Sequence, residues 1–190
     1  MAPRREERQR AGEQDLEQNY VTDEIKSLIG KRSERYPATD DVVPSEVRRF
    51  FQATMDDNPY FWNAEAAAKS RYGEPIAPLG YPVHAFRREP GTPDPLTDAD
   101  NPNFDGERRS FRPGLPPVEI SLSGVLNGGY EYEFFRYARH GDKIFRISSY
   151  HDIYQRPGKN GPMVFVILED LFVDENERPY LRALNTSILR

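Results

Sequence analysis

The C-terminal third of the chain constrains the fold more than any other part, because it has the pattern of antiparallel β-structure. Aromatic and acidic residues alternate from Gly129 to Tyr137, which is typical of a strand with one apolar face. Short turns rich in Gly, Pro, Asp and Asn separate three further apolar stretches: Lys143 to Tyr154, Met163 to Val173, and Pro179 to Leu189. The stretch from Met163 is almost continuously apolar, which favours a central position. The sequence therefore predicts an antiparallel meander.

The N-terminal half is expected to form short helices. Residues 22–31 begin with a capping threonine, carry apolar residues at helical spacing and end at a glycine. An amphipathic run extends from Pro44 to Thr54, and an alanine-rich run extends from Asn63 to Gly73. Tyr81 to Arg87 fits a buried helix with a proline in its first turn. Helices followed by a sheet indicate the α+β class.

Two segments fall outside this pattern. Residues 1–19 are mostly charged or glutamine and predict a disordered extension, or a helix that forms only against a partner. Residues 20–190 then form one domain, which is long enough to bury a core. Within this domain, residues from about 88 to 117 are rich in Pro, Asp, Asn and Gly, and they predict a polar loop insertion.

The composition excludes several classes of protein. The formal net charge is −5 and no block of Lys or Arg dominates, which argues against a nucleic-acid or membrane partner. The chain has no cysteine, so disulfides, thiol catalysis and thiolate metal sites are excluded. Its three histidines are scattered, and we expect neither a metal nor a cofactor. Neither a membrane-spanning run nor the apolar core of a signal peptide is present, so a cytoplasmic location is expected.

A polar turn from Asp56 to Pro59 separates two of the predicted helices. A turn of this kind can aim a carboxylate and an amide into a cleft held by rigid elements. The same residue types also end one helix and cap the next without any role in function. The local pattern leaves both interpretations open.

The order of these pieces resembles the MaoC-like hotdog proteins, and most closely their N-terminal dehydratase-type, fatty-acid-synthase-like domain. The likeness lies in the Asp-x-Asn-Pro turn, in Tyr-Gly-x-x-Ile-Ala-Pro (Tyr72 to Pro78), in a buried helix, and in the strand entry from Leu126 to Tyr132. It covers roughly residues 22–190. The resemblance implies a single hotdog fold, in which an antiparallel sheet wraps around a long central helix. It also implies edge-to-edge pairing with a second hotdog.

The resemblance further implies hydration of a trans-2-enoyl thioester or dehydration of an (R)-3-hydroxyacyl thioester, a carbon–oxygen lyase reaction of lipid metabolism. This chemistry needs a group that activates water and a donor that protonates Cα. The family uses an aspartate and a histidine five residues later. Here Asp56 stands at the aspartate position and Asn58 and Pro59 match, but Phe61 stands at the histidine position. Because a phenyl ring cannot exchange a proton, the dyad is incomplete.

Three other residues are candidate substrate contacts. His84 is the one histidine of the N-terminal half, and its alternative role is that of a hydrogen-bonded core residue. Gly128 and Gly129 stand just before the Tyr130–Tyr137 alternation and would let a thioester approach the backbone closely. Their alternative role is a bend or bulge at the strand entry.

Three functions remain open from the sequence. In the first, the chain is a subunit of an enoyl-CoA hydratase and shapes the acyl tunnel, while a separate MaoC-like subunit supplies the intact Asp/His pair. In the second, a homodimeric hydratase or thioesterase uses Asp56. In the third, a non-catalytic hotdog binds an acyl-thioester or another protein. The resemblance favours the first, with acyl-CoA or another acyl-thioester as substrate and a second hotdog subunit as partner.

Overall fold

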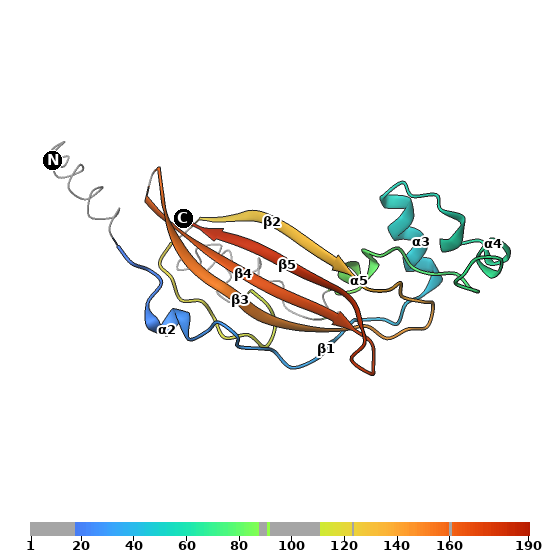
Figure 1. Cartoon of the computed structure of the whole chain (residues 1–190), viewed down its shortest axis with the longest axis horizontal. Coiled ribbons are helices and arrows are strands. Elements are labelled where there is room, and N and C mark those ends of the chain that lie inside the picture. The colour runs from blue at the N-terminus through green and yellow to red at the C-terminus, as the bar shows by residue number, and fades with distance from the viewer. Residues whose placement is uncertain (1–17, 88–90, 92–110, 123, 160) are drawn as a thin grey trace.

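The computed structural model describes residues 18–87, 91, 111–122, 124–159 and 161–190. A curved antiparallel sheet of five strands dominates the described part, with the strand order β1-β3-β4-β5-β2 (Figure 1). The strands are β1 (Tyr36–Pro37), β2 (Val125–Phe134), β3 (Phe145–Gly158), β4 (Gly161–Val173) and β5 (Pro179–Leu189). The predicted antiparallel sheet is therefore present.

The position of each strand follows from its burial. β4 pairs along its length with β3 on one side and β5 on the other, and Val164, Val166 and Leu168 are fully buried, as its apolar sequence predicts. β2 pairs with β5 and not with β3, although β3 follows it in the chain. The chain between them leaves the sheet, because Ala138 is buried and its carbonyl accepts the N–H of Ala77 at 2.8 Å. β2 is thereby left at an edge of the sheet.

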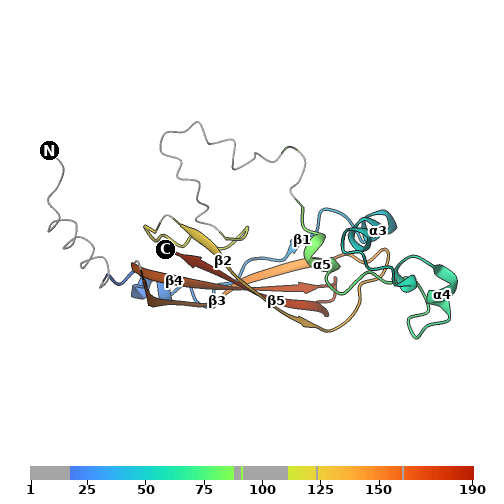
Figure 2. The same ribbon diagram turned by 90° about the horizontal axis from the view of Figure 1, so that it is seen from above.

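The helices are short, and most of them gather at one end of the sheet (Figure 2). They are α2 (Asp23–Lys26), α3 (Pro44–Ala53), the 3-10 turn η1 (Pro59–Phe61), α4 (Ala64–Ala68) and α5 (Tyr81–His84). α3 agrees with the prediction. α4 ends before Gly73, and α5 ends before Arg87 because Phe86 turns toward the sheet, where its ring lies 5.4 Å from that of Phe172.

Among the described residues, no long helix runs along the sheet as the resemblance implied. Part of the face of the sheet that carries the core is covered instead by the segment 111–122, which turns over residues 111–115 and contains no helix; Pro113, Pro116 and Pro117 disfavour one. Leu115, Val118 and Ile120 from this segment join the core beside Tyr150, whose hydroxyl donates to the Pro116 carbonyl at 2.6 Å.

The core has two parts. One lies under the helices at one end of the sheet, and the other joins the segment 111–122 and α2 to the middle strands. Most of the expected extension 1–19 and of the expected loop 88–117 lies outside the described residues. No helix in the described part of the chain is long and apolar enough to cross a membrane.

Candidate functional site

The polar turn lies on the surface between α3 and η1. Met55 adopts a left-handed conformation (φ 55°), which turns the chain away from α3. The Asp56 carboxylate then accepts the N–H of Asn58 at 3.2 Å, and the Asn58 side chain accepts the N–H of Tyr60 at 3.1 Å. Asp56 and Asn58 therefore stabilise their own turn, while the side chain of Asp56 remains exposed to solvent.

Phe61 points from the same turn into the core. Its exposed fraction is 5%, and its ring centroid lies 6.2 Å from that of Phe51 on α3. The position that the resemblance assigns to a histidine is thus occupied by a packed hydrocarbon ring. No hydrogen bond or ion pair joins Asp56 to a histidine within the described residues.

His84 lies in an open groove of about 360 Å³ between α3, α5 and the inner face of β2. Its ring packs 5.2 Å from that of Phe50, and its Nε2 lies 2.6 Å from Nη2 of Arg87. A guanidinium only donates hydrogen bonds, so Nε2 accepts and the ring carries its proton on Nδ1. Burial, followed by the charge of Arg87, lowers the pKa of His84 below its ordinary value. The groove therefore holds a neutral imidazole next to Tyr132 and Phe134 of β2.

Gly128 and Gly129 form a β-bulge on β2. Gly129 has φ 117°, and a Cβ on Gly128 would lie 2.7 Å from Cγ2 of Thr186 on β5. Both glycines are explained by this backbone geometry. They line a depression with Leu184 on the outer face of the sheet, so the structure does not bring them to His84 or to Asp56.

A second open pocket, of about 770 Å³, lies where β2 ends beside the chain that leads from α4 to α5. Four arginines line it together with one carboxylate, and these residues are Arg71, Arg136, Arg139, Arg178 and Asp142. Ile76, Leu79 and Phe134 supply apolar surface. We call this the arginine pocket.

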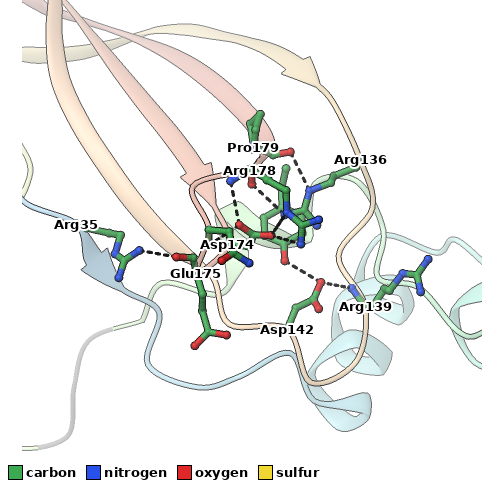
Figure 3. A network of polar contacts seen from close by, with 10 residues as sticks. Arg35, Arg136, Arg139, Asp142, Asp174, Glu175, Arg178 and Pro179 are labelled. Carbon is green, nitrogen blue, oxygen red and sulfur yellow. Dashed lines mark hydrogen bonds and ion pairs between the residues drawn. The ribbon is translucent and has the colours of Figure 1, made fainter.

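Two aspartates organise one wall of the arginine pocket (Figure 3). Asp174 forms ion pairs with Arg136 at 2.9 Å and with Arg178 at 2.8 Å. Burial by itself raises the pKa of Asp174, but hydrogen bonds from the backbone N–H groups of Arg178 and Asn176 outweigh this effect and the pKa lies below its ordinary value. Asp142 accepts the hydroxyl of Tyr180 at 2.8 Å.

Sequence reasoning missed two tyrosines of the arginine pocket. Nη2 of Arg71 donates to the hydroxyl of Tyr72 at 2.8 Å, and this hydrogen bond lowers the pKa of Tyr72. Burial, then Tyr72, and also the negative charge of Asp56 raise the pKa of Tyr137. The turn that begins at Asp56 is tied to the arginine pocket by the carbonyl of Tyr60, which accepts the N–H of the pocket residue Ile76 at 3.1 Å. No sequence spacing could have linked residues so far apart in the chain.

The edge of the sheet beside both pockets is open in the described structure. The rings of Tyr130, Tyr132 and Phe134 stack along the inner face of β2, with centroids 5.7 and 5.9 Å apart. Each of these three rings is exposed by more than two fifths. Phe134 lines the His84 groove and the arginine pocket alike, so the two adjoin at this ring.

The chemistry that these surfaces can perform by themselves is limited. His84 is bound to a cation and not to a carboxylate, and no histidine lines the arginine pocket in the part of the chain that the structure describes. The described residues also contain no group of three or more His, Asp or Glu that could hold a metal ion. The site can bind an amphipathic ligand, but it lacks a histidine–carboxylate pair for proton transfer.

Solved structures with similar folds come from several proteins. A chain of the ChsH1–ChsH2 complex from Mycobacterium tuberculosis superposes with a TM-score of 0.65 at 16% identity, over 87% of this chain and 86% of that chain. A chain of the HadBC (3R-hydroxyacyl-ACP dehydratase) complex from the same organism gives 0.56 at 20% identity, over 85% and 96%. The MaoC-like dehydratase from Rhodospirillum rubrum gives 0.54 at 18% identity, over 83% and 90%. The predicted single hotdog fold of α+β class is confirmed.

Curated protein sequences give no significant match to the chain. The family model described as FAS1-like, dehydratase domain region matches residues 27–181. This span includes the polar turn, both pockets and most of the sheet. This match confirms the predicted dehydratase-type, fatty-acid-synthase-like family, and the chain belongs to the family described as FAS1-like, dehydratase domain region.

Proposed function

We propose that the chain is the non-catalytic subunit of an enoyl-thioester hydratase or (R)-3-hydroxyacyl-thioester dehydratase. One observation carries this proposal: Phe61 occupies the histidine position and is packed in the core, beside an exposed Asp56. The catalytic Asp/His pair then comes from a second MaoC-like hotdog subunit. This chain contributes surface that binds the acyl-thioester.

The two open pockets support this role. The His84 groove is apolar and the arginine pocket is polar, with Arg136 and Arg178 paired to Asp174 and Arg139 paired to Glu74. This combination matches a ligand with an acyl end and a polar end. Both pockets adjoin the open edge at β2, where a partner would close them. Two of the structural relatives are themselves components of two-protein complexes, which is consistent with a partner of the same fold.

Hydration of enoyl-CoA substrates tests the proposal, followed at the absorbance of the conjugated thioester over short and long acyl chains. We expect no turnover by the purified chain alone, and turnover when a MaoC-like subunit with an intact histidine is added. Asp56→Asn in this chain should leave the rate of the mixture unchanged.

Two other outcomes would point to the other functions. Turnover or thioester hydrolysis by the chain alone that is lost in Asp56→Asn would identify a homodimeric enzyme that uses its exposed Asp56. Binding of acyl-CoA without turnover in either setting would identify a hotdog that binds its ligand only.

A further inference from the structure

The outer face of the sheet, opposite the core, carries a row of apolar residues that crosses four strands. Along β4 the buried Val164, Val166 and Leu168 alternate with residues that lie on this outer face. Four outer-face residues are direct neighbours in the strand register: Tyr154 on β3, Phe165 on β4, Ile188 on β5 and Leu126 on β2. We call these four residues the apolar row.

The apolar row is open to solvent in the described structure. None of its members belongs to either part of the core, and Leu126 is 40% exposed. The rings of Tyr154 and Phe165 stack with centroids 4.9 Å apart and an angle of 6° between their planes. The helices α2, α3 and α5 and the segment 111–122 pack on the core face instead. Adjoining apolar side chains on a solvated sheet face are typical of a contact surface.

Two opposite charges flank the apolar row on β3. Asp152 precedes Tyr154 by two residues and Arg156 follows it by two, so both lie on the outer face, each about 7 Å from the row. The guanidinium carbon of Arg156 lies 5.0 Å from the ring centroid of Tyr154 and 5.6 Å from that of Phe165. Neither Asp152 nor Arg156 has an ion-pair partner among the described residues. The face thus carries an unpaired negative and an unpaired positive charge at equal distances from the row.

This arrangement of charges is complementary to itself. A two-fold axis that runs along the apolar row, between two copies, stacks their outer faces with the strands antiparallel. Each residue of the row then meets its own counterpart, and Arg156 of either copy faces Asp152 of the other. On β4 the same rotation brings Ile167, which is level with Asp152, against Met163, which is level with Arg156. The apolar contacts and the two ion pairs therefore form together.

Other two-fold axes along the rows or the strands of this face lack the match. Moving the axis by one row in either direction brings the two Asp152 or the two Arg156 side chains together. An axis along the strands stacks each row on itself. Asp152 shares its row with Ile167, Thr186 and Gly129, so it would then meet a neutral residue or a second Asp152. Like charges in contact, and charges covered without a partner, are unfavourable.

We propose that the apolar row is the contact surface for a second copy of this chain, in a back-to-back dimer joined by two Asp152–Arg156 ion pairs. The His84 groove and the arginine pocket stay uncovered, because they lie at the inner face and the end of β2. The edge of β2 also stays free. The inference therefore goes beyond the proposed function and does not depend on it.

A charge-swap experiment with the full-length chain tests this contact. Asp152→Arg puts two positive charges at each of the two ion-pair positions, and Arg156→Asp puts two negative charges there. We expect either variant alone to dimerise at least about tenfold more weakly than the wild type, because two attractive pairs become repulsive. An equimolar mixture of the two variants has opposite charges at both positions, so it should associate as tightly as the wild type. Sedimentation equilibrium measures all four samples.

Two further variants separate this contact from misfolding and from general charge effects. The double variant Asp152→Arg/Arg156→Asp exchanges the two charges within one chain and should dimerise as the wild type does. Arg48→Asp makes the same charge change at an exposed position of α3 and should also leave dimerisation unchanged.

Three results would overturn the proposal. They are a wild type that stays monomeric, single variants that dimerise as tightly as the wild type, and a mixture that associates no more tightly than its components. Dimerisation through the edge of β2 would give the second result. No thioester and no second protein is used, so failure here is distinct from failure of the hydration assay.

Discussion

At the scale of single residues, the contacts that fold the turn after α3 differ from those that proton transfer would need. Asp56 and Asn58 close the turn through their side chains, and Phe61 anchors it in the core. These contacts do not require a histidine. The turn can therefore fold without a proton-transfer residue at position 61.

Introducing a histidine at position 61 should not create an active site in this chain. Phe61→His places a polar ring in a buried apolar site, so we expect the free energy of unfolding to fall by about 1–3 kcal/mol and enoyl-CoA hydration by the chain alone to stay at background. Urea unfolding and the hydration assay measure the two effects.

Trp62→His is the matched control, because Trp62 is 56% exposed and its replacement should leave stability nearly unchanged. Hydration gained in Phe61→His would show that position 61 faces the reacting atoms.

At the scale of elements, the segment 111–122 is tied to the sheet by an ion pair. Asp170 on β4 is buried, and it accepts from Nη2 of Arg112 at 2.7 Å and from the hydroxyl of Ser148 at 2.6 Å. Nε of Arg146, which is also buried, lies 4.0 Å from the same carboxylate. The carboxylate of Asp170 thus compensates the positive charges of Arg112 in the segment 111–122 and of Arg146 on β3.

Removing the carboxylate of Asp170 should lower the free energy of unfolding far more than removing an exposed carboxylate. Asp170→Ala leaves two largely buried guanidinium groups without it, so we expect a loss of about 3–5 kcal/mol in the free energy of unfolding. The control is Glu65→Ala, which breaks the exposed ion pair with Lys69 and should change stability by less than about 0.5 kcal/mol. Equal losses in chemical denaturation would contradict the role assigned to Asp170.

The turn between β4 and β5 should contribute to acid sensitivity. Because the pKa of Asp174 is lowered in the folded state, its contribution is present above the pKa of an unfolded aspartate and disappears as the pH falls through the folded value. Stability of the wild type should therefore fall below about pH 4. Asp174→Asn should be less stable at neutral pH and show a shallower decline, measured as melting temperature against pH. Parallel curves would contradict this.

The sequence predicts where strands and helices lie along the chain better than it predicts which of them lie next to one another. β5 has the predicted bounds, and β4 has the predicted central position. Both predictions rest on the pattern of apolar residues, which depends directly on burial. The edge position of β2 depends on the crossover through Ala138, and the early end of α5 depends on Phe86 meeting Phe172. The arginine pocket joins residues from distant segments, so no local pattern could predict it. The roles of Asp56, Asn58, His84, Gly128 and Gly129 in binding or catalysis remain predictions.

At the scale of the whole molecule, both pockets are open on the side of β2. The His84 groove and the arginine pocket share Phe134, and neither is enclosed by the described residues. The central strand β4, by contrast, is paired on both sides. Protection from solvent should therefore differ across the sheet.

Hydrogen exchange should resolve this difference in the chain alone. We expect the amides of β4 to exchange slowest, because they open only with global unfolding, and those β2 amides that point away from β5 to exchange fastest among the long strands. Mass spectrometry of exchanged peptides measures both. Uniform protection of β2 and β4 would show that the edge is already covered.

The exposed strand also has a consequence for how the protein is made. β2 has no proline or lysine to block further strands, and only its two glutamates oppose stacking of newly made copies. Replacing both glutamates by neutral residues would remove that protection and leave the edge as a template for aggregation. Under the proposed function the partner subunit would cover this edge, so producing the chain together with that partner should lower its aggregation.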